Sequence, residues 1–93
     1  MHCYVDKKDP NVVVINSTFW TEDDLQYCFY HNFDKIIYTE PRSSNFIDLI
    51  EELYKNGYKL EKIIARKIMH SQKIELELTP FAYFTKTNTI KEI

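Results

Sequence analysis

Two short apolar runs, each followed by a segment with helical spacing, constrain the fold of this chain more than any other feature. The first run is NVVVIN at residues 11–16, and the second is DKIIYTEP at residues 34–41. Continuous apolar runs of this length are typical of strands that are buried on both faces of a sheet. Strands of this kind separated by helices predict an α/β domain.

Both helical segments carry signals at their ends. The first begins at Thr21, an N-cap residue that three acids follow, and it ends near Asn32, which tolerates the left-handed conformation. The second, within residues 43–57, starts from a serine or asparagine cap and places its apolar side chains on one face. Gly57, the only glycine of the chain, falls just beyond its last periodic residue, and we expect it to stop the helix.

The remainder of the chain predicts a hairpin. Residues 58–69 and 74–81 have the character of strands, and in the latter apolar and polar residues alternate, which indicates one packed face and one solvated face. The predicted fold is a two-layer α/β sandwich in the order β-α-β-α-β-β. It has a mixed four-stranded sheet, two helices on one face because both crossovers are right-handed, and a C-terminal antiparallel hairpin.

Length and composition set further limits. The 93 residues are expected to form a single domain, 1–93, with a polar lead at 1–10 and a tail at 85–93 that fray. Lys and Arg total 12 and Asp and Glu total 14, and this charge of −2 disfavours nucleic-acid binding by the chain alone. No apolar run has the roughly 18 residues that span a membrane. The start of the chain has no signal segment, so we expect a cytoplasmic protein.

The aromatic residues of the first helical segment point to a protein partner. Trp20, Tyr27 and Tyr30 provide more ring surface than one buried helix face needs. Tyrosines beside acidic residues suit protein interfaces, although ordinary partial burial explains the same residues. The uncovered face of the sheet is a second candidate surface, open to solvent, to a partner, or to another copy of the chain in a homo-oligomer.

A polar group follows the second predicted strand. Arg42, Ser43 and Ser44 stand where the carboxyl end of that strand meets the start of the next helix. Open α/β sheets bind ligands at such an edge, and a helix N-terminus favours an anion. A helix cap beside a solvated arginine is the simpler alternative.

Two pairs of metal-ligating residue types lie at one end of the predicted fold. His2 and Cys3 belong to the N-terminal lead, and Cys28 and His31 to the end of the first helix. Zinc accepts four such ligands, but their spacing differs from that of common zinc motifs. We therefore predict no metal and no cofactor, and we expect both cysteines to be free thiols.

Several short motifs resemble a known family. ELYKNGYKLEKI, residues 52–63, resembles the start of the terminal hairpin in class I S-adenosylmethionine-dependent methyltransferases, and the RNA 5-methyluridine methyltransferases are the most similar. VVVINSTF, IIYTEP and RKIMHSQKIE resemble further motifs of that family. The resemblance covers residues 11–81. It implies that Glu75 stands at the position of the general base and that Thr39 occupies the place of the nucleophilic cysteine.

The resemblance also shows what the chain lacks. It has no catalytic cysteine at residue 39, and only about ten residues, without a glycine-rich cofactor loop, precede the first strand. Methyl transfer by this chain alone is therefore not expected. We predict a small non-catalytic protein-binding or inhibitory module of viral or mobile-element type. The alternatives are a degenerate methyltransferase-like half-domain that completes an RNA-modifying complex, and a small anion- or nucleotide-binding domain.

Overall fold

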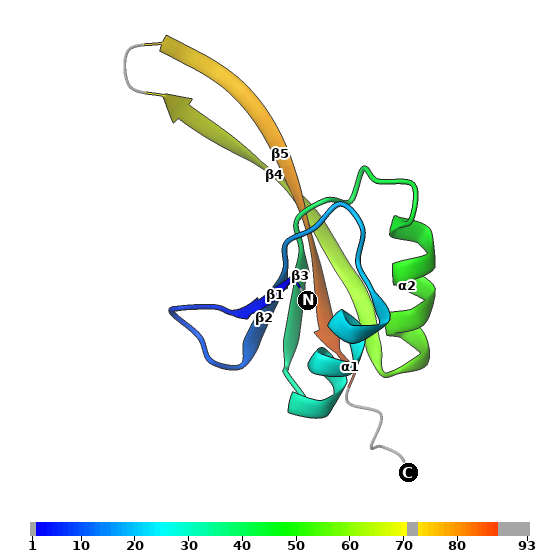
Figure 1. Cartoon of the computed structure of the whole chain (residues 1–93). Helices are drawn as coiled ribbons and strands as arrows, with labels where there is room; N and C mark the ends of the chain where they lie inside the picture. Colours follow the sequence, from blue (N-terminus) through cyan, green and yellow to red (C-terminus); the bar gives the residue numbers. More distant parts are fainter. Residues whose placement is uncertain (1, 71–72, 88–93) are drawn as a thin grey trace.

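Two helices and five strands make up the computed structural model, which describes the backbone of residues 2–70 and 73–87 and the side chains of residues 2–64 and 81–87. In chain order the elements are β1 (Cys3–Val5), β2 (Val12–Ile15), α1 (Glu22–His31), β3 (Lys35–Tyr38), α2 (Phe46–Lys55), β4 (Tyr58–His70) and β5 (Lys73–Lys86). Both helices lie on the same side of an open sheet (Figure 1). In this described part, neither helix is long and apolar enough to cross a membrane.

The sheet mixes parallel and antiparallel neighbours in the order β1-β2-β3-β5-β4. β2 runs parallel to β3, with Val13 opposite Ile36. β5 lies between β3 and β4 and is antiparallel to both, so β3 and β4 point in the same direction. The crossovers through α1 and α2 therefore step across the sheet in one direction, and right-handed connections place both helices on one face.

A fifth strand corrects the predicted four-stranded sheet. Cys3–Val5, within the predicted polar lead, pair antiparallel with Val13–Ile15 as β1. Three residues are too few to show a periodic pattern, and their pairing depends on β2 already being in place. At the other end of the chain β5 continues to Lys86, so it includes the first two residues of the predicted tail at 85–93. Residues 88–93 lie outside the described part.

The ends of α1 form at the predicted residues. The Asp24 N–H donates to Thr21 Oγ1 at 3.3 Å, and the Thr21 N–H donates to the Asp24 carboxylate at 2.8 Å. This capping box satisfies backbone groups that the start of the helix would leave unpaired. At the other end Asn32 has φ 56°, the left-handed conformation expected of it.

Gly57 ends α2 as predicted and also links two strands. Its φ is +90°, where a residue with a side chain is strained. Its carbonyl oxygen accepts hydrogen bonds from the N–H and the Oγ1 of Thr87, at 2.6 and 2.9 Å. The residue that turns the chain out of α2 therefore also joins the start of β4 to the end of β5.

We expect Gly57→Ala to lower the free energy of unfolding by about 1 kcal/mol, because alanine is strained at this backbone angle. The added Cβ would meet only Thr87 Oγ1 at 3.8 Å, an ordinary contact, so the loss comes from the backbone. Urea denaturation measures the change. Lys55→Ala, at an exposed position in the preceding turn, is the control and should shift stability by no more than about 0.5 kcal/mol. An unchanged midpoint for Gly57→Ala would contradict the interpretation.

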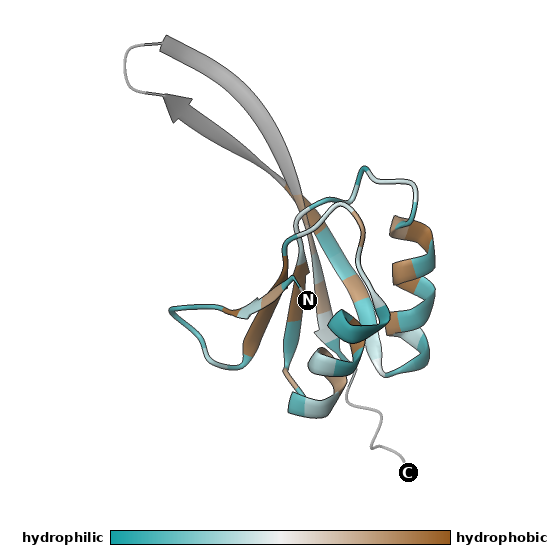
Figure 2. Ribbon diagram, in the orientation of Figure 1, coloured by the Kyte–Doolittle hydropathy of each residue, from teal (hydrophilic) through white to brown (hydrophobic). Residues whose placement is uncertain are grey.

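The core lies between the two helices and one face of the sheet. Its strand residues alternate along β2, β3 and β5, and Figure 2 shows hydrophobic residues along these strands and on α2. The most buried members are Val13, Ile15, Leu25, Cys28, Ile36, Tyr38, Leu49, Leu53, Ala82 and Phe84. Each fully buried Leu or Phe contributes about 1.5–3 kcal/mol. Ala82 and Phe84 follow residue 81, so the predicted end of the last strand was wrong.

β4 and β5 continue beyond the sheet as a two-stranded ribbon. β3 pairs with β5 only as far as the Tyr38–Ala82 pair, whereas β4 and β5 remain paired as far as His70 and Lys73. Figure 1 shows this ribbon projecting from the rest of the fold. It gives the molecule a long axis of 54 Å, against 24 and 20 Å in the other directions.

Candidate functional site

The sheet face opposite the helices carries a row of side chains that crosses all five strands. From β1 to β4 the row is Tyr4, Val14, Ile37, Tyr83 and Lys62. Val14 is buried, and Ile37 and Tyr83 are half-buried. Tyr4 is 50% exposed. The centre of this face is therefore apolar, and neither helix covers it.

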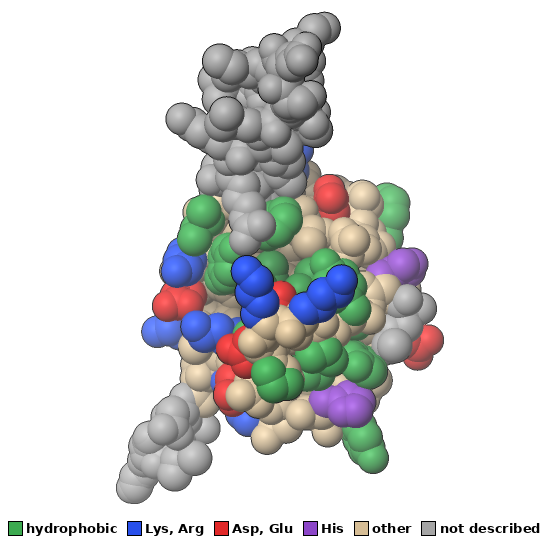
Figure 3. Space-filling model, turned by 90° about the vertical axis from the view of Figure 1, so that its left-hand side faces the viewer, with side chains coloured by type: hydrophobic (Ala, Val, Ile, Leu, Met, Phe, Trp, Pro, Cys, Tyr) green, Lys and Arg blue, Asp and Glu red, His purple; other side chains and the backbone are tan. Residues whose placement is uncertain are grey.

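Lysines surround this apolar strip. Lys35, Lys59 and Lys62 come from the strands, and Lys7 and Lys8 come from the loop between β1 and β2; all five are exposed. Figure 3 views the molecule from this side and shows lysine side chains close to hydrophobic ones. The surface formed by these residues is called the open face below: Tyr4, Val14, Ile37, Ile64, Phe81 and Tyr83, with Lys7, Lys8, Lys35, Lys59 and Lys62.

The loop between β1 and β2 forms one wall of a hollow of about 700 Å³ on the open face. The carboxylate of Asp6 accepts hydrogen bonds from the N–H groups of Lys8 and Asp9 at 3.2 and 3.1 Å. The Asp9 carboxylate accepts from the Asn11 N–H at 3.0 Å. Both acids thus bind the backbone of their own loop and hold its shape. The hollow is also lined by Lys35, Ile37, Glu61, Lys62 and Tyr83.

A bulge in β4 shapes the same hollow. Leu60 pairs with Phe84 but Lys62 already pairs with Tyr83, so Glu61 is the extra residue. Glu61 accepts a hydrogen bond from Thr85 Oγ1 at 2.7 Å. This bond lowers the pKa of Glu61 against the effect of desolvation, and nearby lysines lower it further. Lys62 Nζ lies 5.6 Å from the centre of the Tyr83 ring, within range of a cation–π interaction.

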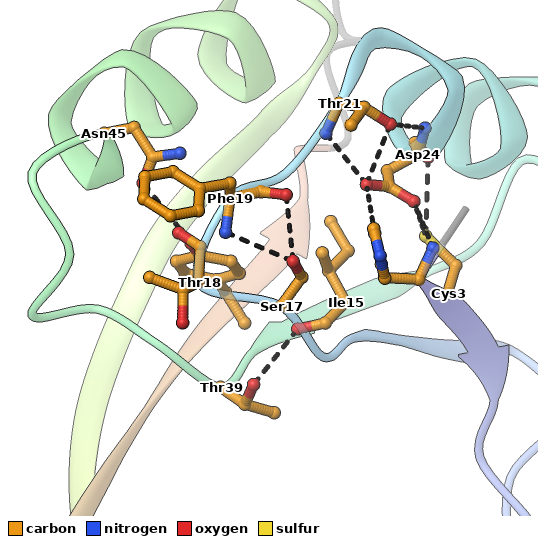
Figure 4. Close-up of polar contacts among 11 residues, drawn as sticks. Cys3, Ile15, Ser17, Thr18, Phe19, Thr21, Asp24, Thr39 and Asn45 are labelled. Carbon is orange, nitrogen blue, oxygen red and sulfur yellow. Dashed lines mark hydrogen bonds and ion pairs between the residues drawn. The ribbon is translucent and has the colours of Figure 1, made fainter.

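The carboxyl ends of β2 and β3 meet at a second group of polar residues (Figure 4). Thr39 Oγ1 donates to Asn16 Oδ1 at 2.9 Å and lies 3.4 Å from the Ile15 oxygen. Tyr38 OH donates to the Thr18 oxygen at 3.0 Å. These bonds join the ends of the two parallel strands, and Thr39 is buried. Thr39, which the resemblance would align with a nucleophilic cysteine, therefore links the two strands in this fold.

The three predicted anion-binding residues differ in their surroundings. Ser43 Oγ donates to Asn45 Oδ1 at 2.6 Å and lies 3.1 Å from Tyr38 OH. Arg42 and Ser44 are exposed. The structure thus uses the Ser43 hydroxyl within the turn that precedes α2.

The three aromatic residues expected at a protein interface also differ in their surroundings. Trp20 packs against the core and donates from Nε1 to the Asn45 oxygen at 3.0 Å, which connects the segment before α1 to the start of α2. The Tyr27 ring packs against His31 and Phe33, with centroids 4.5 and 5.9 Å away. Of the three predicted residues, Tyr30 projects furthest into solvent, with 85% of its surface exposed.

The four residues of metal-ligating type have different neighbours. His2 and Cys3 lie beside α1, and the Cys3 thiol contacts Cys28, which together with burial raises the pKa of Cys3. His31 belongs to the last turn of α1 and contacts Tyr27 and Tyr30. Within the described residues, no three His, Cys, Asp or Glu side chains are arranged to hold a metal ion.

Asp24 holds the N-terminal segment against α1, a role that the sequence did not indicate. Its buried carboxylate accepts from the His2 N–H at 2.6 Å, from the Cys3 thiol at 3.4 Å, and from the Thr21 N–H and hydroxyl at 2.8 and 3.1 Å (Figure 4). Burial alone would raise the pKa of Asp24, but the hydrogen bonds from His2 and Thr21 lower it below its ordinary value of 3.8. The capping-box pattern was the only signal in the sequence.

We expect Asp24→Asn to lower the free energy of unfolding at pH 7 by about 2–3 kcal/mol, because a neutral amide leaves part of this buried group unsatisfied. Chemical denaturation followed by circular dichroism measures the change. Asp23→Asn, at the exposed neighbouring position, is the matched control and should cost less than about 1 kcal/mol.

The pH dependence gives a second test of Asp24. Its pKa is lower in the folded state, so the folded chain binds fewer protons than the unfolded chain just below pH 3.8. The stability that the carboxylate contributes is complete above that pH and is lost as the pH falls through the folded pKa. The difference in the free energy of unfolding between the Asp24→Asn variant and the unmodified protein should therefore shrink below pH 3.8. A constant difference would refute the role of the charge.

Glu75, which the resemblance would align with a general base, lies on β5, and its side chain is outside the described residues. No protein-family model, curated protein or solved structure matches the chain. The fold and the chemistry of its surfaces are therefore the basis for any functional proposal.

Proposed function

We propose that this chain is a small non-catalytic module that binds a protein partner through the open face of its sheet. The observation that carries the proposal is the apolar strip at the centre of that face, with lysines around it. Protein-binding surfaces commonly have an apolar centre and a polar rim, and tyrosine is enriched in them. The strip contains two tyrosines, Tyr4 and Tyr83.

The exposure of the strip supports this proposal. Ile64 is 39% exposed and half-buried Phe81 pairs with it across β4 and β5. Together with Tyr4 and Tyr83 these side chains extend the strip from β1 toward the base of the ribbon. A contact here would remove apolar surface from water, at about 25 cal/mol for each Å² buried.

The ribbon adds a second reason to expect a partner. A two-stranded hairpin without a third strand or a packed layer is only marginally stable in water. From the Ile64–Phe81 pair outward, β3 no longer accompanies β5. A partner seated on the open face would lie next to the base of the ribbon, where the third strand ends.

The polar residues at the carboxyl edge of the sheet favour binding over catalysis. The hydroxyl groups of Tyr38, Thr39 and Ser43 all form hydrogen bonds within the fold. Their hydrogen bonds connect the ends of β2 and β3 to the start of α2, which is a structural role. A catalytic serine or threonine instead needs an adjacent base that can take its proton.

We expect Tyr4→Ala to weaken binding of the partner about tenfold, because tyrosine is enriched among the few interface residues whose truncation costs more than about 1 kcal/mol. Tyr30→Ala is the matched control, since Tyr30 is more exposed but lies on α1. The partner is first isolated by affinity capture from host extract at stoichiometric yield, and its purified form is then titrated against each variant by calorimetry. Equal melting temperatures show that both variants are folded.

The opposite result would place the interface on α1. If Tyr30→Ala weakens binding and Tyr4→Ala does not, the surface predicted from the aromatic residues of the helix is the one in use. If neither variant changes the affinity, the open face is not the binding surface.

A second candidate is the methyltransferase-like half-domain, and the position of β5 favours it. The resemblance implies a terminal hairpin whose last strand is inserted antiparallel between two strands of common direction, and β5 has this position between β3 and β4. Strand order alone does not determine activity, because one fold carries many functions. On this hypothesis a second chain would supply the cofactor loop.

For this candidate we expect S-adenosylmethionine to bind only when the captured partner is present. Calorimetric titration of the cofactor into the chain alone, into the partner alone, and into the complex measures this. Heat that appears in the complex but in neither component supports the half-domain. The absence of heat in all three titrations removes it.

A further inference from the structure

We infer that the partner presents an acidic protein segment to the open face; this inference rests on the proposed function. The reason is that the two layers of the molecule carry opposite charge. Within α1 and α2 there are six acidic residues and one lysine. The open face carries five exposed lysines from the strands and from the β1–β2 loop. The overall charge of −2 conceals this separation.

The acids near the lysines do not neutralise them fully. Asp6 and Asp9 bind the backbone N–H groups of their own loop, at distances of 3.0–3.2 Å. Glu61 accepts a hydrogen bond from Thr85 at 2.7 Å and lies among Lys35, Lys59 and Lys62. Three acids thus stand against five lysines on this surface. Added carboxylates would find unsatisfied positive charge there.

The form of the open face favours a protein over a nucleic acid. Single-stranded nucleic acids bind to sheets by stacking their bases on exposed aromatic rings. The Tyr83 ring is half-buried with Lys62 Nζ 5.6 Å over it, and the 50% exposed Tyr4 ring lies at the β1 end of the row. These two rings are separated by Val14 and Ile37, so they do not form a continuous platform for successive bases. The acidic helix layer would also repel the backbone of a long nucleic acid. An acidic segment with apolar side chains satisfies both the lysines and the strip.

The form of β4 favours contact with the face rather than addition of a strand. β4 is an edge strand of the sheet, where an extended peptide could pair. The bulge at Glu61 and the charged residues Lys59 and Lys62 interrupt that edge beside the hollow. Bulges and edge lysines are features that prevent strand pairing. The segment is therefore expected to lie across the strands, in the hollow between the loop and β4.

The same charges argue against a symmetric pair of these chains. Two copies that met through their open faces would bring lysines against lysines in an isologous contact. The acidic helix layer of a second copy could meet the open face, but only in a head-to-tail contact that does not close. The mass of such an assembly would increase with protein concentration, so measuring the mass at several concentrations would detect it.

The test uses the full chain with defined probes, observed by NMR. The probes are a ten-residue peptide of alternating Glu and Tyr, its Lys and Tyr counterpart, and a ten-nucleotide single-stranded poly-dT. We expect the acidic peptide to shift the amide signals of Ile37, Lys62 and Tyr83 but not those of α2. Its affinity should fall at least fivefold between 50 and 500 mM salt, because screening weakens contacts between exposed charges.

We expect the double variant Lys35→Glu with Lys62→Glu to bind the acidic peptide at least tenfold more weakly. Lys55→Glu, on α2, is the matched control and should bind like the unmodified chain. If the reversed charges disturb the fold, the milder double variant Lys35→Gln with Lys62→Gln replaces it. Its affinity for the acidic peptide should be at least threefold lower than that of the unmodified chain. Melting temperatures check that each variant is folded.

Three outcomes would overturn the inference. The first is that poly-dT or the basic peptide binds more tightly than the acidic one. The second is that the acidic peptide binds equally to the charge-reversed variant. The third is that ultracentrifugation shows growth with concentration that the charge reversal abolishes, which makes a second copy the occupant.

Capture of the partner by the variants distinguishes a failure of this inference from a failure of the proposed function. If Tyr4→Ala weakens capture but the charge-reversed variant does not, the open face binds a protein whose contact is not acidic. If neither substitution weakens capture, the proposed function fails as well.

Discussion

The right-handedness of the two crossovers is the constraint on which the remaining structure depends. Both α1 and α2 connect strands that point in one direction, and both step the same way across the sheet. The two helices therefore cover one face and build the core there. Neither α1 nor α2 covers the other face, although Val12 and Val14 of β2 are apolar and buried on it. Its partly apolar, partly basic surface follows from this one-sided coverage.

One buried carboxylate fastens the edge of the sheet to the helix layer. Asp24 caps α1 from within and also accepts hydrogen bonds from His2 and Cys3, which brings β1 next to β2. β1 in turn places Tyr4 and the following loop on the open face. The capping of a helix and the shape of the proposed binding surface are therefore physically coupled. The coupling passes through a group that is not exposed to solvent.

The secondary structure could be predicted where local physical chemistry determines it. Thr21, Asn32 and Gly57 have the cap and turn roles that their residue types favour, and both short apolar runs are strands. The prediction failed for segments whose structure depends on the strands they pair with. β1 has three residues and pairs only because β2 and Asp24 are in place, and β5 extends past Phe81 because β3 and β4 flank Ala82 and Phe84.

By itself, the sequence determined the two helices, the caps of α1, the glycine that ends α2, the strands β2 and β3 and the α/β class, because each depends on residues that are close in the chain. The expected side-chain cap at the start of α2 does not form. The tertiary structure alone decided which side chains share a surface. It placed Trp20 and Tyr27 against packed neighbours, and it gave the buried Thr39 a structural bond. It also gathered lysines from the β1–β2 loop and from two strands around one apolar strip. Such gathering depends on strand order and register, which connect residues distant in the chain and leave no local pattern.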